Sequence, residues 1–196
     1  MMRRLAALAT ACTLAVLAAS CSSPPSKFYT LSAVASSSSA TSQLSIVVGP
    51  VSVPPMIDRP QIVVTTAANQ VALDEFNRWA SSVSDNLGSV VADNLAALLG
   101  TNRVAVSAQT VSTDFDYRVQ IDVRNFESAP GKYAALDAFW AVRRVKDGKL
   151  ETGRTSARET VQDSSYDALA AAHSRAAGKL SEDIANAVRT LDRQAL

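Results

Sequence analysis

The sequence is poor in the side chains on which enzymes and metal sites depend. It has two cysteines and one histidine in 196 residues, and both cysteines, Cys12 and Cys21, lie close to the N-terminus. From residue 22 onward there is no cysteine, which excludes a disulfide, a thiolate nucleophile and a cysteine-ligated metal from that part. A domain without thiols suits an oxidising compartment.

Catalytic motifs are missing as well. The chain has no HExxH, no Walker A sequence and no GxGxxG after a strand. The single histidine, His173, falls on the apolar stripe of a helical segment, where a core role is the ordinary one. Asp114, Asp116 and Asp122 are spaced like the solvated face of a strand and not like a set of metal ligands. We therefore expect a protein that is not an enzyme, with no cofactor and no metal.

Neither sign of charge dominates, and no apolar run is long enough for a spanning helix. The formal net charge is +1, so the chain has no electrostatic attraction for nucleic acid. The uncharged apolar run at residues 5–19 is rich in alanine and shorter than the roughly 20 residues that cross a bilayer.

What is present at the N-terminus is an export signal. Arg3 and Arg4 precede the apolar run, and small residues then lead directly to Cys21. The pattern resembles a bacterial lipobox and predicts a signal peptide at residues 1–20, an acylated Cys21 and a tether at residues 21–26. An ordinary secretory peptide cut near Ala19 is the alternative. Ser22 follows the cysteine, where an aspartate would retain a lipoprotein at the inner membrane, so we expect the outer membrane.

The rest, residues 27–196, has the length of a single periplasmic domain. Strands are expected at residues 27–31, 44–53 and 61–66, with residues 69–73 completing a hairpin, and the serine-rich residues 32–43 form a loop. Gly49 and Pro50 suggest a bulge or break in the second strand. A helical stripe then begins, with Asp74 as its N-cap and Gly100 at its end.

The second half of the domain again has strands followed by a helix, without any repeat of the sequence itself. A short strand is expected at residues 103–107, and residues 115–123 alternate strictly between apolar and polar, up to a slip in phase at residues 125–126. Strands are predicted at residues 136–146 and 149–161, joined in a hairpin by a turn at Asp147 and Gly148. The second of these strands is expected at a sheet edge. Residues 166–191 form a helix capped by Ser164. These elements predict an α/β (α+β) fold with two long amphipathic helices on one mixed β-sheet.

Two features could belong to a site. The loop containing Pro54, Pro55, Asp58, Arg59 and Pro60 is rigid and carries one acid and one base, which suits a partner-binding loop or a salt-bridged turn. The two tryptophans, Trp79 and Trp140, could line a cavity, but core positions are the usual place for them.

The pieces "FYTL", "VGPVSVPPMIDRPQIVV" and "DEFNRWA" resemble the ABC-type transport auxiliary lipoproteins, the PqiC-like family, over nearly the whole domain. The resemblance implies a non-catalytic docking subunit of an MCE-type intermembrane lipid transport system that supports membrane integrity. Its partners would be a periplasm-spanning MCE-domain protein and the membrane permease or ABC component, with homo-oligomers also possible. The alternative is a stand-alone periplasmic lipoprotein that binds a ligand or lipid between helix and sheet.

Overall fold

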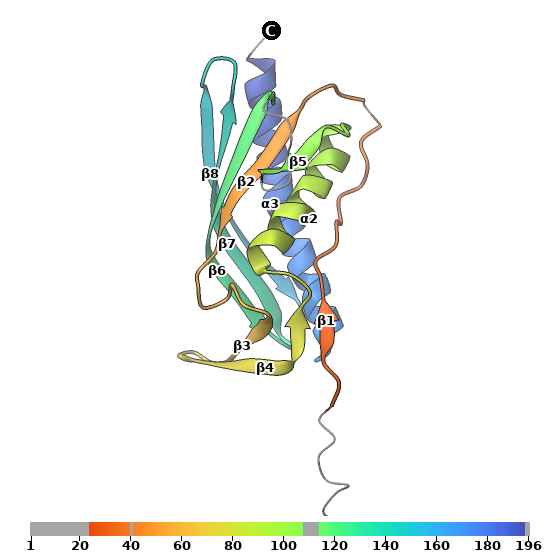
Figure 1. Cartoon of the computed structure of the whole chain (residues 1–196), viewed down its shortest axis with the longest axis vertical. Coiled ribbons are helices and arrows are strands. Elements are labelled where there is room, and N and C mark those ends of the chain that lie inside the picture. The colour runs from red at the N-terminus through yellow and green to blue at the C-terminus, as the bar shows by residue number, and fades with distance from the viewer. Residues whose placement is uncertain (1–23, 40, 108–113, 195–196) are drawn as a thin grey trace, which may run out of the picture.

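The computed structural model describes residues 24–39, 41–107 and 114–194. Within these ranges the chain forms eight strands and two helices (Figure 1), in the order β1 (Lys27–Tyr29), β2 (Ile46–Ser52), β3 (Gln61–Ala67), β4 (Gln70–Trp79), α2 (Val83–Leu99), β5 (Val104–Val106), β6 (Tyr117–Ala129), β7 (Tyr133–Arg144), β8 (Leu150–Thr160) and α3 (Tyr166–Arg193). The predicted α+β class and the order strands, helix, strands, helix are confirmed.

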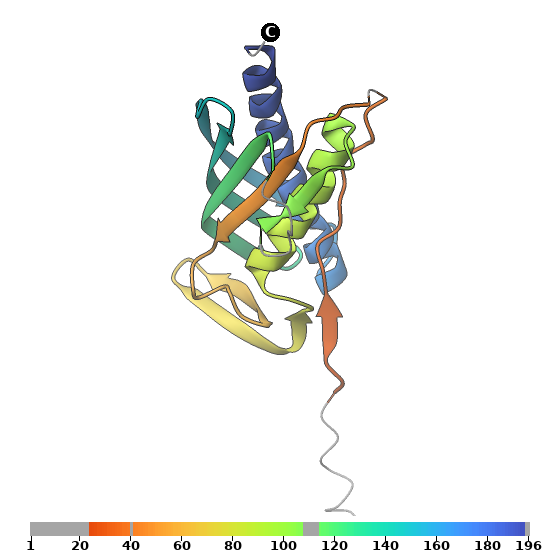
Figure 2. The same ribbon diagram turned by 45° about the horizontal axis from the view of Figure 1, so that its top comes forward.

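The strands form two mixed sheets and not the single sheet that the sequence suggested. One sheet has the order β5-β2-β6-β7-β8 and the other the order β1-β4-β3. The smaller sheet lies across the lower end of the larger one (Figure 2). The loop after β2 turns the chain away from the five-stranded sheet, so the following hairpin pairs with β1 instead. Strand β8 is an edge strand, as expected.

Both helices cover the same face of the five-stranded sheet, where α2 contacts β2 and α3 contacts β7 and β8. The alternation along β6 follows from this, because Tyr117, Val119, Ile121 and Val123 are buried while the residues between them are exposed. The predicted slip in phase is a shift of register between β6 and β7 after Val123. A shift also interrupts the pairing of β2 with β6 around Gly49 and Pro50.

The first helix starts eight residues later than predicted, with its N-cap at Ser82 and not at Asp74, because Asp74 lies in a strand. Its carboxylate accepts hydrogen bonds from the backbone N–H groups of Phe76 (2.9 Å) and Asn77 (2.7 Å) inside a bulge of β4. The N-cap is Ser82, whose hydroxyl accepts from the backbone N–H of Asp85 at 3.1 Å.

The other helix ends agree more closely with the sequence. Gly100 ends α2 in the left-handed conformation, with φ of 62°, as its position predicted. Helix α3 is capped by Ser165 and not by Ser164, since the Ser165 hydroxyl accepts from the backbone N–H of Ala168.

The segment between β1 and β2 runs beside both helices and is an internal loop, as expected. The backbone N–H groups of Val34 and Ala35 both donate to the side-chain carbonyl of Asn94, at 2.9 and 3.0 Å. Nearer β1, the backbone N–H of Ser32 donates to the hydroxyl of Ser174 on α3. Buried polar side chains on the helices therefore take the place of a strand partner for this segment.

Candidate functional site

The two residues predicted to carry and sort the lipid, Cys21 and Ser22, lie outside the described residues. The described chain begins at Pro24, three residues after Cys21. Neither α2 nor α3 is long and apolar enough to cross a membrane, among the helices the structure describes.

The loop of residues 54–60 is held in one shape. Its backbone turns on the Pro54 carbonyl, which accepts from the N–H groups of Ile57 (3.0 Å) and Asp58 (3.3 Å), and the Ile57 side chain is buried. The Asp58 carboxylate accepts from the hydroxyl of Ser84 (3.2 Å) and from its backbone N–H (3.4 Å). These contacts fasten the loop to the first turn of α2, where a negative charge is favourable.

Arg59 takes no part in that contact. Among the described residues the carboxylate of Asp58 binds Ser84, and no ion pair joins Asp58 to Arg59. The Nε atom of Arg59 is buried and has no hydrogen-bond partner in the described part of the chain. The structure thus brings Asp58 to the end of a helix but does not bring the acid and the base of the loop together.

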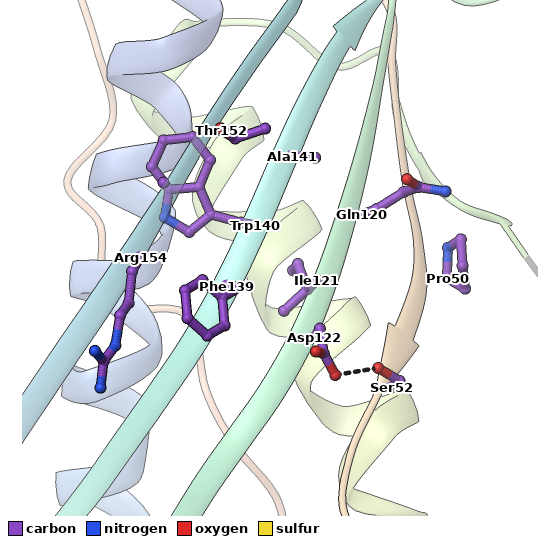
Figure 3. A pocket seen from close by; sticks show the side chains of 11 residues that line it. Pro50, Ser52, Gln120, Ile121, Asp122, Phe139, Trp140, Ala141, Thr152 and Arg154 are labelled. Carbon is purple, nitrogen blue, oxygen red and sulfur yellow. Dashed lines mark hydrogen bonds between the residues drawn. The ribbon is translucent and has the colours of Figure 1, made fainter.

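A groove of about 650 Å³ lies on the face of the five-stranded sheet that the helices leave open (Figure 3). Strand register builds it. Ser52, Asp122, Phe139 and Arg154 lie side by side across β2, β6, β7 and β8, and a neighbouring row has Gln120, Ala141 and Thr152. Of the large apolar side chains that line the groove, Phe139 is the exposed one, at 47%.

Charged side chains on this face hold one another in place beside the exposed ring. Arg154 forms two hydrogen bonds with Asp137, from Nε at 2.8 Å and Nη2 at 2.6 Å, while its guanidinium carbon lies 5.5 Å from the centre of the Phe139 ring. These hydrogen bonds lower the pKa of Asp137 and raise that of Arg154. The groove therefore offers one aromatic ring beside a guanidinium group that is already oriented.

Two of the three aspartates considered from the sequence tie β2 to β6. The hydroxyl of Ser45 donates to Asp116 at 2.7 Å, and the hydroxyl of Ser52 donates to Asp122 at 2.8 Å. Two hydrogen bonds lower the pKa of Asp122. The one from Ser52 has the larger effect, and the one from Arg124 the smaller. Both aspartates are on the exposed side of β6, as predicted, but each has a structural partner at one end of β2.

Trp140 packs on the helix side of the sheet and also lines part of the groove (Figure 3). Its indole N–H donates to the Thr155 hydroxyl at 3.1 Å, and that hydroxyl donates to Asp183 on α3 at 2.5 Å. The indole lies where a side chain at position 153 would be, because a Cβ atom on Gly153 would approach it to 2.2 Å. Trp79 is buried in the core, as expected, whereas Trp140 is partly buried against the core and borders the groove.

His173 is also a core residue. Its Nε2 lies 2.8 Å from the hydroxyl of Ser128, and Nδ1 has no hydrogen-bond partner in the described part of the chain. Complete burial lowers the pKa of His173 to about 3, because desolvation disfavours the imidazolium.

Sequence reasoning missed Phe139 and Arg154. Each lies in a segment that was correctly assigned to a strand, but only the register places them next to each other. Arg154 falls in a strand with polar residues on both sides, which gives no local sign of a site.

Comparison with known proteins agrees with this fold. A protein XCC0632 from Xanthomonas campestris, of family DUF330, superposes with a TM-score of 0.70 at 20% identity, over 87% of this chain and 98% of the other. A second crystal structure, of an uncharacterized protein, gives a TM-score of 0.68 at 19% identity, over 84% and 99%. No curated protein matches the sequence. The family model described as the ABC-type transport auxiliary lipoprotein component matches residues 29–185. Because the match covers most of the chain, the protein belongs to the family of ABC-type transport auxiliary lipoprotein components.

Proposed function

We propose that the protein is a non-catalytic docking subunit, anchored in the outer membrane through acylated Cys21, for the MCE-domain protein of an intermembrane lipid transport system. Family membership supplies the coarser part of this proposal, an auxiliary lipoprotein of ABC-type transport. The MCE-domain partner, the outer membrane and the role in membrane integrity are the proposed part.

The observation that carries the docking role is the open face of the five-stranded sheet. It presents an exposed aromatic ring beside an arginine whose position is fixed by Asp137. Exposed aromatic and arginine side chains are the residues that most often dominate binding at protein interfaces. The groove lies on an uncovered sheet face, and the rigid loop of residues 54–60 comes shortly after β2, which forms one border of the groove.

The experiment is recovery of the MCE-domain protein with this protein from cross-linked membranes of the native host. Phe139→Asp should reduce the recovered partner by about tenfold or more if the ring is a central contact. Asp93→Lys is the matched control, because it changes the charge of an exposed residue on α2, away from the groove. Equal recovery with Phe139→Asp would exclude the groove, and wild-type protein that brings down no MCE-domain protein would exclude the function.

A ligand-binding lipoprotein is the second candidate, and the volume of the groove favours it. About 650 Å³ falls within the range of small-molecule sites. The groove lies on the sheet face opposite the helices, and not between helix and sheet as the sequence suggested. Co-purification of phospholipid with the wild-type protein in a 1:1 ratio would favour this candidate if Phe139→Asp abolishes that co-purification.

A further inference from the structure

The three-stranded sheet has an apolar outer face. Val63 is directly opposite Leu73, and Thr65 is opposite Val71, so these four side chains share one face of the sheet. Ile62, which precedes Val63 in β3, points to the other face and is completely buried in the core. Leu73 and Val71 point to the side opposite Ile62 and are 43% and 44% exposed, while Val63, opposite Leu73 on that same face, is buried.

Strand β1 extends the same face. Phe28 pairs with Arg78 of β4, and its neighbour Tyr29 points inward, where it packs against Tyr166 of α3. Phe28 consequently points outward, and at 64% it is the most exposed large apolar side chain of those the structure describes. Phe76, in the bulge of β4, is 41% exposed. We call Phe28, Val71, Leu73 and Phe76 the apolar platform.

The position of the platform in the chain indicates what covers it. Figures 1 and 2 place the small sheet at the end of the molecule where β1 begins. Phe28 is seven residues after Cys21, and seven residues span at most about 25 Å. An acyl chain on Cys21 would therefore keep Phe28, at the β1 edge of this face, within about 25 Å of the bilayer surface.

The residues around the platform suit a lipid surface. Aromatic side chains are favoured at the boundary between headgroups and acyl chains, and basic side chains extend from there to the phosphates. Lys27 precedes Phe28 and is exposed. Arg78, the neighbour of Phe28 across the sheet, pairs with Glu75 at 3.4 Å, so Lys27 is the basic side chain here that can extend to the phosphates. Large apolar side chains gathered on one exposed face are typical of a surface that contacts a membrane or a protein.

We propose that the apolar platform lies in the interfacial layer of the bilayer that carries the lipid anchor, as a second membrane contact. The proposal rests on the anchoring of Cys21 in the proposed function and goes beyond it, because it fixes the orientation of the domain. With the platform on the lipid, the long axis of the five-stranded sheet points away from the membrane and leaves the groove accessible from the periplasm.

The absence of cysteine after residue 21 provides the test. A mature, acylated protein has no free thiol, so one introduced cysteine can be labelled selectively with a fluorophore. Leu73→Cys reports on the platform, and Phe139→Cys is the control, because the two positions are similarly exposed but lie on different sheets. Val71→Cys repeats the measurement on the same face if Leu73→Cys does not fold.

Each labelled protein is reconstituted in vesicles of phosphatidylethanolamine and phosphatidylglycerol, with and without nitroxide-labelled lipid. Quenching by the nitroxide lipid should be at least threefold stronger at position 73 than at position 139. Equal quenching at the two positions, in protein that floats with the vesicles, would overturn the proposal. So would energy transfer between labels at position 73 without lipid quenching, because the covering surface would then be a second copy of the chain.

Failure of this inference is distinguishable from failure of the proposed function. Partner recovery is measured in membranes of the native host, whereas quenching is measured in vesicles without a partner. The quenching result therefore does not depend on whether an MCE-domain protein is found. Mass spectrometry of the mature protein settles the shared premise. A Cys21 without acyl groups would overturn the inference together with the anchoring.

Discussion

The imidazole of His173 lies flat against the ring of Phe126, with 3.9 Å between the ring centres and 8° between the planes. His173 belongs to α3 and Phe126 to β6, and Trp79 of β4 meets both rings edge-on. The stack therefore joins the last helix to both sheets. Only a neutral imidazole fits this position, because no acidic group contacts it in the described part of the chain.

The first prediction is a dependence of stability on pH that comes from His173. The pKa of His173 is about 3 in the folded protein against 6.5 when exposed, so its contribution is complete above pH 6.5. It decreases as the pH falls toward 3, by about 1.4 kcal/mol per pH unit, because only the unfolded chain takes up the proton. Denaturant unfolding between pH 4.5 and 7.5 measures this slope.

His173→Leu is the matched variant. It should flatten the slope below pH 6.5 and, at pH 7.5, lower the free energy of unfolding by about 1–3 kcal/mol, because the Ser128 hydroxyl loses its buried partner. The same pH slope in the wild type and in His173→Leu would show that the imidazole is not the titrating group.

The second prediction separates binding from folding in the loop of residues 54–60. Asp58→Ala and Ser84→Ala each remove one side of the same contact, and each should lower the free energy of unfolding by about 1 kcal/mol. If the loop binds a partner, Asp58→Ala should weaken partner recovery more than Ser84→Ala does at equal Tm. Equal losses of recovery would assign the loop a structural role alone.

A third prediction concerns Gly153. Any side chain there would collide with the indole of Trp140, so Gly153→Val should cost about 3 kcal/mol and change the near-ultraviolet circular dichroism. Thr152→Val, the neighbouring exposed position, should change stability by less than about 0.5 kcal/mol. A stable Gly153→Val protein with an unchanged spectrum would contradict the packing described for Trp140.

The fourth prediction is the cellular address. Wild-type protein should be found in the outer membrane, since two acyl chains already anchor a protein stably. Cys21→Ala should be released or retained as an uncleaved precursor, and Ser22→Asp should move to the inner membrane. Fractionation with marker proteins checks all three, and wild-type protein in the inner membrane would refute the outer-membrane docking model.

Periodicity alone located most elements, and Asp74 explains its main error. A helix N-cap and the bulge in β4 use the same interaction, a carboxylate that accepts backbone N–H groups two and three residues ahead. Phe76 and Trp79 also fit a helical stripe, so local sequence supports both structures. Pairing with β1 and β3 stabilises the strand over the helix. Such pairing depends on residues far away in the sequence, so the local pattern could not predict it.

The polar residues within the helices were the other signal not used. Asn86 and Asn94 are buried in α2, where an asparagine is unfavourable unless it has a partner. Asn86 accepts from the hydroxyl of Thr30, and Asn94 binds the backbone of residues 34 and 35. A pair of asparagines on an otherwise apolar stripe could have indicated that an irregular segment lies against the helix. The groove had no such sign, because Phe139 and Arg154 meet only through strand register.

The route of the segment after β1 has a mechanical consequence. Tension on the N-terminal end reaches β1 first, and β1 pairs with β4 over only three residues. Beyond it the force passes to the hydrogen bonds that Asn86, Ser174 and Asn94 make along the two helices. A pulled molecule should therefore release its first strand at low force and extend by a short length, while the five-stranded sheet and both helices stay folded. That extension would act as a compliant link between a bilayer and anything held by the domain.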